Sequence, residues 1–248
     1  MSNSKCVYGP AAFLLIFLSA VLIVPLRAAE FSDETQSGAT ISGTYSGLSP
    51  VQDDECEETD YKCQVEQYSR DIEANPGDAD TFLKRGYAYN ELGEFELGIK
   101  DYTQAIKLNP FDPIAFYNRA YAFDELGKYE KAIRDYTRAI QINDRDADFY
   151  YNRGNAYDDL DEYDQAIADY TAALELEPSE YKAYFNRALS YYNKGDFISA
   201  IKDYTKAIEL DATDPDAYYN RANAYEEIGE MEKAEADRRK YEELKKTS

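Results

Sequence analysis

The chain has 248 residues, with 49 Asp and Glu against 27 Lys and Arg, and a net charge of −22 at neutral pH. A chain this acidic repels phosphate backbones and anionic lipid head groups, which argues against nucleic acid as a partner and favours basic peptides or basic protein faces. The sequence contains no His, the usual general acid–base residue and a common zinc and haem ligand, so composition argues against an enzyme, a metal site and a cofactor.

Residues 1–29 have the pattern of an export signal. Lys5 precedes an uncharged apolar run at 11–26, and small residues follow. The residue three positions before a cut after Ala28 or Ala29 is not small, as cleavage would favour, so an uncleaved N-terminal anchor is the alternative. We therefore expect a periplasmic or secreted protein, or an outward-facing anchored one whose membrane contact is confined to this segment.

Residues 30–55 are rich in Ser, Thr, Gly and acidic side chains, and contain few apolar ones. Such a segment buries too little apolar surface to fold, and we expect a disordered linker. Residues 56–76 follow with apolar side chains at helical spacing. They align with the second helix of the repeats described below, and we predict an N-terminal capping helix there.

Two cysteines, Cys56 and Cys63, lie in or beside this predicted capping helix. A close pair of cysteines suggests a disulfide in an oxidising compartment. If the intervening residues formed a continuous helix, the two Cα atoms would be roughly 10 Å apart, beyond the reach of a disulfide. A bridge therefore requires Cys56 to lie outside the helix, and two free thiols are the alternative.

From residue 79 the sequence repeats every 34 residues without insertion or deletion. The repeat units are 79–112, 113–146, 147–180, 181–214 and 215–248. A Gly or Asp near the middle of each unit predicts a turn between two helices, because Gly adopts the left-handed conformation that ends a helix. In the last unit, Glu235 and Arg238 interrupt the apolar stripe of the second helix, which predicts a C-terminal cap. The predicted fold class is all-α, a solenoid of antiparallel helix pairs.

Each unit also carries one Arg and one Asp that are equally distant from the turn. In an antiparallel helix pair, residues equidistant from the turn lie at the same height, so each pair is predicted to form a structural salt bridge. Arg suits this role because its planar guanidinium can bind a carboxylate through two hydrogen bonds. The pairs are Arg85–Asp101, Arg119–Asp135, Arg153–Asp169, Arg187–Asp203 and Arg221–Asp237.

Residues 79–248 resemble the tetratricopeptide repeat, and the sequence pattern YNRG…AY…AI.DY resembles a sub-type associated with bacteria. The match consists of the 34-residue period, an aromatic residue early in the first helix, Gly or Ala after it, Ala and aromatic residues in the second helix, and a closing Pro. Arg153 and its equivalents depart from the family, which usually has Leu there. The resemblance implies a right-handed superhelix whose first helices line a concave groove, and a non-catalytic scaffold that binds proteins or peptides.

The predicted groove residues lie on the first helices, outside the packing stripe. Tyr offers flat apolar area and Asn can both donate to and accept from peptide amides, while nearby acids would select a basic partner. The alternative for Asn is that it satisfies local backbone groups. The candidates are Leu83, Tyr87, Tyr117, Asn118, Tyr121, Tyr151, Asn152, Asn155, Phe185, Asn186, Tyr219, Asn220 and Asn223.

The alternative function is an accessory or chaperone-like subunit of a cell-envelope enzyme or secretion assembly, which would bind through the convex face or an end cap. Asp144, Asp146 and Asp148 alternate as at the start of a calcium loop, but the Gly and Glu that such a loop requires are absent, so we predict an acidic turn. The sequence leaves the partner's identity and the oligomeric state open.

Overall fold

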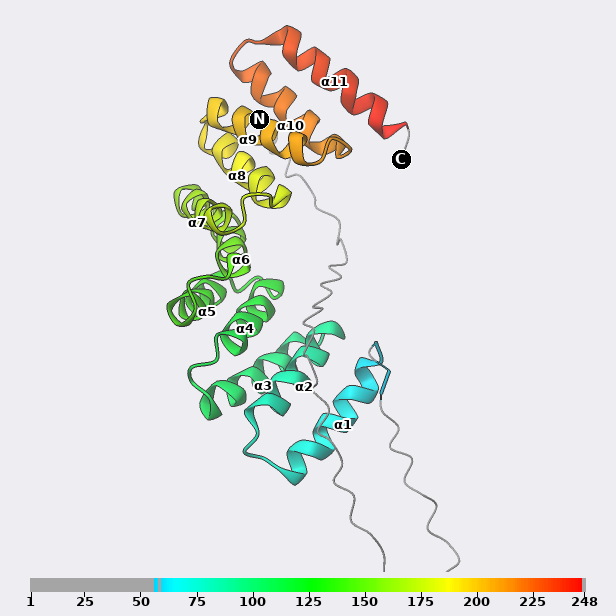
Figure 1. Cartoon of the computed structure of the whole chain (residues 1–248), viewed down its shortest axis with the longest axis vertical. Coiled ribbons are helices and arrows are strands. Elements are labelled where there is room, and N and C mark those ends of the chain that lie inside the picture. Colours follow the sequence, from blue (N-terminus) through cyan, green and yellow to red (C-terminus); the bar gives the residue numbers. More distant parts are fainter. Residues whose placement is uncertain (1–55, 58, 247–248) are drawn as a thin grey trace, which may run out of the picture. The chain divides into compact units, whose positions relative to one another are not determined.

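The computed structural model describes residues 56–57 and 59–246, and the predicted export segment and linker lie outside them. The described part contains eleven α-helices and no β-strand (Figure 1). The helices are α1 (Tyr61–Ala74), α2 (Ala79–Glu91), α3 (Phe95–Leu108), α4 (Pro113–Glu125), α5 (Tyr129–Ile142), α6 (Ala147–Asp158), α7 (Tyr163–Leu176), α8 (Tyr181–Lys194), α9 (Phe197–Leu210), α10 (Pro215–Glu227) and α11 (Met231–Lys245).

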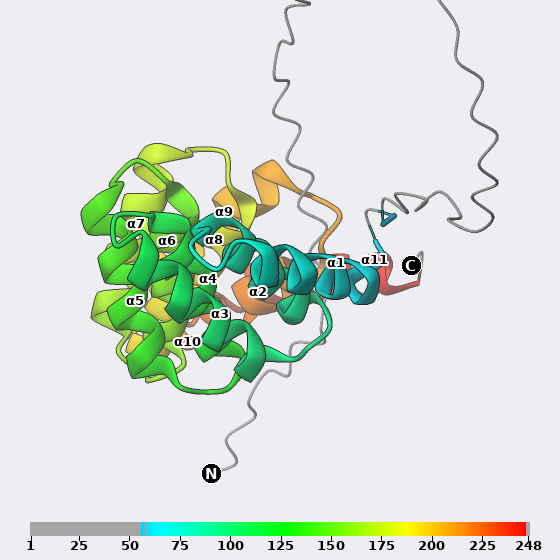
Figure 2. The same cartoon turned by 90° about the horizontal axis from the view of Figure 1, so that it is seen from below.

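We call α2, α4, α6, α8 and α10 the A helices and α3, α5, α7, α9 and α11 the B helices; each unit contains one of each. Every A helix packs against its own B helix and against the helix before it, with α1 in that place for α2. Neighbouring A helices also touch one another, whereas neighbouring B helices do not, within the described helices. The A helices therefore lie on the inner side of the stack, which Figure 2 views end-on.

The turn between the A and B helices depends on a residue with positive φ in every unit. Gly93, Gly127, Gly195 and Gly229 have φ values of 65–89°, and Asp161 has a φ of 59°. An L-residue in this region is strained by contact between Cβ and the backbone, and glycine is not. The third unit therefore uses a less favourable residue at a position where the other four use Gly.

Asp161→Gly is expected to stabilise the chain by about 0.5–1 kcal/mol, because it removes this strain at an exposed position. The lost side chain accepts a hydrogen bond only from the exposed Tyr163 hydroxyl. Urea unfolding of the variant measures the change. The reverse substitution at the equivalent turn, Gly127→Asp, should destabilise by a similar amount; a stabilised Gly127→Asp chain would contradict the explanation.

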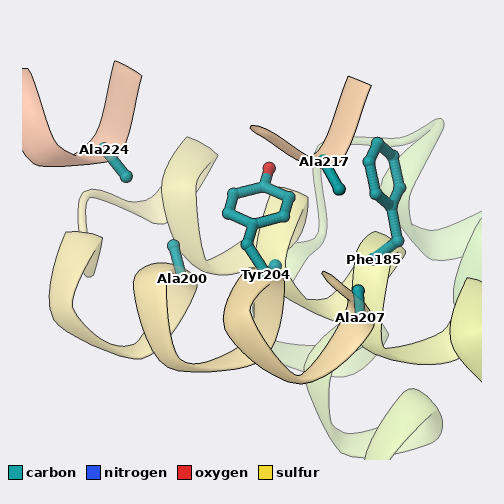
Figure 3. Packing of buried hydrophobic residues seen from close by; sticks show 7 residues of the cluster. Phe185, Ala200, Tyr204, Ala207, Ala217 and Ala224 are labelled. Carbon is teal, nitrogen blue, oxygen red and sulfur yellow. The ribbon is translucent and has the colours of Figure 1, made fainter. Parts of the chain in front are cut away.

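The core contains small residues, aromatic residues of the A helices such as Phe149 and Phe185, and one large aromatic residue in each B helix except α11. Tyr102, Tyr136, Tyr170 and Tyr204 are fully buried. In Figure 3, Tyr204 of α9 extends towards Ala217 and Ala224 of α10, beside Ala200. Ala at these positions lets the helices approach closely enough to enclose the tyrosine ring, as dense packing of a core requires.

The acidic turn before α6 caps a helix. Asp146 is the N-cap of α6, and its side chain accepts a hydrogen bond from the Asp148 backbone N–H at 3.1 Å. Capping by Asp satisfies a backbone donor that the first helical turn leaves unpaired. Within the described residues no group of His, Cys, Asp or Glu side chains is arranged to hold a metal ion.

Candidate functional site

The repeated arginines bind their own chain in every unit. Arg153 donates from Nε to Asp169 Oδ2 and from Nη2 to Asp169 Oδ1, both at 2.7 Å. Its remaining Nη1 donates to Thr137 Oγ1, in the B helix of the preceding unit, at 2.9 Å. The same three bonds recur at Arg85, Arg119, Arg187 and Arg221, with donor–acceptor distances of 2.6–3.1 Å.

Sequence reasoning missed the hydroxyl residue in this arrangement. Each arginine reaches a Ser or Thr that stands sixteen positions earlier in the chain: Ser69, Thr103, Thr137, Thr171 or Thr205. The column is visible in the sequence at the 34-residue period. It links consecutive units, because one guanidinium bridges a carboxylate in its own unit and a hydroxyl in the previous one.

Cys56 and Cys63 form a disulfide in the structure, with an S–S distance of 1.97 Å and a Cα–Cα distance of 5.6 Å. Cys63 lies in the first turn of α1, and Cys56 precedes the helix. The N-cap residue Asp60 accepts a hydrogen bond from the Cys63 backbone N–H at 3.0 Å, which begins the helix after Cys56. This geometry is the one that a bridge over so short a separation requires.

Several aromatic or apolar side chains that were predicted to line the groove are more buried than expected. Phe185 is 6% exposed and packs in the core against Tyr204, so it is not a groove residue. Leu83 is half-buried against the cluster of Phe82, Ala105 and Ala115. Both side chains therefore pack between helices and offer little surface to a ligand.

Tyr117 and Tyr151 are also half-buried, and their hydroxyls are hydrogen-bonded within the chain. Asn152 Nδ2 donates to Tyr117 Oη at 3.0 Å, and Asn186 Nδ2 donates to Tyr151 Oη at 3.0 Å. Each bond joins one A helix to the next. These asparagines therefore tie neighbouring A helices together, and Asn152 Nδ2 also donates to the Asp148 carbonyl at 2.9 Å, as in the alternative of a local backbone contact.

Two further groove candidates contact their own chain. Asn155 Oδ1 accepts from Asn186 Nδ2 at 3.0 Å, and Asn223 Oδ1 accepts from Arg238 Nη2 at 3.0 Å. Asn118 and Asn220, at the repeat position of Asn152 and Asn186, are half-buried.

Three predicted groove residues keep substantial exposed surface. Tyr87 is 46% exposed, Tyr121 is 38% exposed and Tyr219 is 37% exposed. Tyr219 already carries the guanidinium of Arg238, whose Cζ lies 5.3 Å from its ring centroid. Tyr87 and Tyr121 lie one unit apart on α2 and α4, and they form the exposed aromatic surface of the inner side.

Acidic side chains stand at the C-terminal ends of the A helices, beside these tyrosines. Asp124 and Asp158 occupy equivalent positions on α4 and α6, and burial is the main cause that raises their pKa values. The pKa of Asp124 is raised to about 7, with further contributions from the negative charges of Asp159 and Glu125. The pKa of Asp158 is raised to about 6.

The two carboxylates differ in their hydrogen bonds. Asp158 lies 2.8 Å from the Tyr170 hydroxyl and accepts from Ser190 Oγ at 2.8 and 2.9 Å. Asp124 Oδ1 is buried without a hydrogen bond, and so is the hydroxyl of Tyr136, the equivalent of Tyr170. Ala156 of the third unit stands where the fourth unit has Ser190, so Asp124 in the second unit lacks that donor.

Tyr170→Phe is therefore expected to cost about 1–3 kcal/mol, because Asp158 and Asn155 lose the buried donor that lies 2.8 Å from each of them. Tyr136→Phe should change stability by less than about 0.5 kcal/mol. Both tyrosines are fully buried at equivalent positions, so the pair isolates the hydrogen bond from the packing. Chemical unfolding of the two variants tests this. Equal losses in the two variants would show that packing alone decides.

Comparison with known families agrees with the repeat pattern. A model described as TPR repeat matches residues 86–127, 121–161 and 190–229. Models described as tetratricopeptide repeat match 147–180 and 215–247, so the matches together cover more than half of the chain. The chain belongs to the tetratricopeptide repeat family. The search of curated proteins found no significant match.

Solved structures show the same fold. YrrB, described as a TPR protein with an unusual peptide-binding site, is 22% identical with a TM-score of 0.66, over 73% of this chain and 93% of that one. A crystal structure of MamA is 29% identical with a TM-score of 0.60, over 62% and 90% of the two chains. MamA from Desulfovibrio magneticus RS-1 is 17% identical with a TM-score of 0.64, over 75% and 97%.

Neither the family models nor these similar structures represent an enzyme family. Among the helices of the described residues, none is both long and apolar enough to span a membrane. The tetratricopeptide fold is that of a protein–protein interaction scaffold.

Proposed function

We propose that this tetratricopeptide protein is a non-catalytic scaffold that binds a basic protein or peptide segment on the inner side of its first two or three units. The observation that carries the proposal is the exposed pair Tyr87 and Tyr121 beside the acidic ends of α2 and α4. Exposed tyrosines supply rigid contact area, and carboxylates at helix C-termini add to the negative end of the helix dipole. A cationic segment would neutralise the carboxylates and the negative end of the helix dipole.

The chain's own contacts restrict where such a segment can bind. Tyr151, Asn152 and Asn186 are engaged across the A helices, so their surfaces contribute shape more than free hydrogen-bonding groups. Tyr87 contacts Tyr61 and Tyr121 contacts Phe95 edge-on, with ring centroids 6.4 and 6.5 Å apart. These contacts hold the two exposed rings in place before a partner arrives, which lowers the entropy cost of binding.

The test is capture of partners from an extract of the source cells by the wild-type chain and by Tyr87→Ala/Tyr121→Ala. We expect the double variant to lose the captured protein. The matched control is Ile198→Ala, which removes a 73% exposed apolar side chain from the B helix α9. If the control loses the partner and the double variant retains it, binding lies elsewhere, as in the accessory-subunit alternative.

We also propose that the chain is exported. Support comes from the apolar run at 11–26 and from the Cys56–Cys63 disulfide, which belongs to an oxidising compartment. Fractionation of cells that express the full chain, with mass measurement of the product, tests the proposal and distinguishes a cleaved signal from a retained anchor. A full-length chain in the cytosolic fraction with free thiols would refute it.

A further inference from the structure

The position near the C-terminal end of the A helix carries an acid in three units, and two of these acids are satisfied within the chain. Asp158 is bound by Tyr170 and Ser190, as described above. Glu226, the equivalent in the last unit, accepts from Arg238 Nε at 2.8 Å. Asp124 is the third, and its buried Oδ1 has no hydrogen bond.

The side chains around Asp124 leave its Oδ1 without a donor. Tyr136 is 0% exposed, its hydroxyl has no hydrogen bond, and after burial the charge of Asp124 is the main cause that raises its pKa. Tyr136 holds the position of Tyr170, whose hydroxyl lies 2.8 Å from Asp158 in the next unit, but no hydrogen bond joins Tyr136 to Asp124. An unpaired buried hydroxyl next to a buried, unpaired carboxylate oxygen is costly, which is a reason to look for a ligand at this place.

The last unit shows which chemistry fits this position. The guanidinium of Arg238 binds the acid Glu226 and the Asn223 side chain, and its Cζ lies 5.3 Å from the Tyr219 ring centroid. In the second unit, the positions of Glu226, Asn223 and Tyr219 are held by Asp124, Tyr121 and Tyr117. Tyr136 stands where the last unit has Arg238, so the second unit has the acid but not the cation. Tyr117, at the position of the stacked Tyr219, is half-buried and bound by Asn152, whereas Tyr121 keeps an exposed ring.

The surface next to Asp124 is open and negative. Tyr121 is 38% exposed, and Glu125 follows at the end of the helix. α4 has no basic residue in its last turn. A planar guanidinium can stack on an aromatic face and donate to a carboxylate at the same time, which suits this combination better than a compact metal ion does.

We propose that the inner side of the second unit contains a subsite for the guanidinium of an arginine in the partner segment, with Asp124 as the acceptor and Tyr121 as the stacking surface. The subsite rests on the proposed function, because it assigns a chemistry to one place on the same inner surface. The arginine would supply from outside the cation that Arg238 supplies from within the last unit.

The test uses the full chain and a fluorescently labelled synthetic peptide of alternating Arg and Ala, with the same peptide carrying Gln in place of Arg as the reference. Fluorescence anisotropy measures affinity. We expect the wild-type chain to prefer the Arg peptide, and Asp124→Asn to lower its affinity about tenfold. The matched control Asp158→Asn removes the same charge from the unit whose acid is already paired, and should lower the affinity by less than about twofold.

Equal losses in Asp124→Asn and Asp158→Asn would overturn the inference, because they would indicate a general attraction to the acidic surface. No preference for the Arg peptide over the Gln peptide would also overturn it. A Lys peptide that binds as well as the Arg peptide would refute the guanidinium assignment. None of these results decides the proposed function, which depends on capture of the natural partner through Tyr87 and Tyr121.

Discussion

Arg153→Met is expected to destabilise the chain by about 3–5 kcal/mol, because it leaves the Asp169 carboxylate buried without its cation. Asp169 is 8% exposed, and both of its oxygens accept from Arg153 at 2.7 Å. The substitution also removes the bond to Thr137 that joins the third unit to the second. Arg153 has a stacking contribution as well, since its Cζ lies 5.8 Å from the Tyr150 ring centroid.

The double variant Arg153→Met/Asp169→Leu should recover most of this loss. Replacing both members of a buried ion pair with apolar residues of similar volume is often neutral or stabilising, because two desolvation costs disappear together. Urea unfolding of the single and double variants measures the difference. Arg145→Met, an exposed arginine in the turn before α6, is the control and should change stability by less than about 0.5 kcal/mol. A double variant as unstable as the single one would contradict the explanation.

Stability should fall as the pH rises from about 4 to about 7, and Asp124 should account for up to ~4 kcal/mol of the fall. Its pKa is about 7 in the folded chain and near the ordinary value of 3.8 when unfolded. Between these values the folded state binds the proton that the unfolded state has released, so raising the pH favours unfolding. The penalty is absent below the unfolded pKa and fully developed above the folded one.

Asp124→Asn should remove this share of the pH dependence and stabilise the chain above pH ~7, because a neutral amide costs less to bury than a carboxylate. The first unit already has Asn90 at this position. The groups whose charges couple to Asp124 are Tyr121, Glu125, Tyr129, Tyr136 and Asp159.

Unfolding free energies of the wild type and the variant, measured across this pH range, provide the test. Asp144→Asn, at an exposed turn position, controls for the change in net charge. If the variant retains the full wild-type slope, the charge of Asp124 is not the cause. A smaller slope of the same sign should remain in the variant, since burial also raises the pKa of Asp158, to about 6.

The repeat pattern carried the prediction of the fold. A fixed period of 34 residues, with Gly at the turns and small residues in columns, predicts helix pairs that stack only on their neighbours. The Arg–Asp pairing could also be predicted, because two residues equidistant from a turn must lie at one height. These features depend on spacing along the chain, which the sequence states directly.

The predicted groove could not be judged in the same way. Whether Tyr151 or Phe185 faces a ligand or a neighbouring helix depends on the angle between successive A helices, and that angle arises from packing between units. In the structure Phe185 is buried, and the hydroxyls of Tyr117 and Tyr151 accept hydrogen bonds from asparagines of the next unit. Tyr87 and Tyr121 stay exposed.

The sequence by itself determined the helix pairs, their order and the arginine column, since periodicity and turn residues act locally. The tertiary structure alone decided which acids at the C-terminal ends of the A helices are paired. Asp124 and Asp158 are identical residues at equivalent positions, yet the second lies against Ser190 of the next A helix and the first against a unit that has Ala156 there. That difference is made across units, because Ser190 stands thirty-two residues from Asp158 and meets it only when the helices stack.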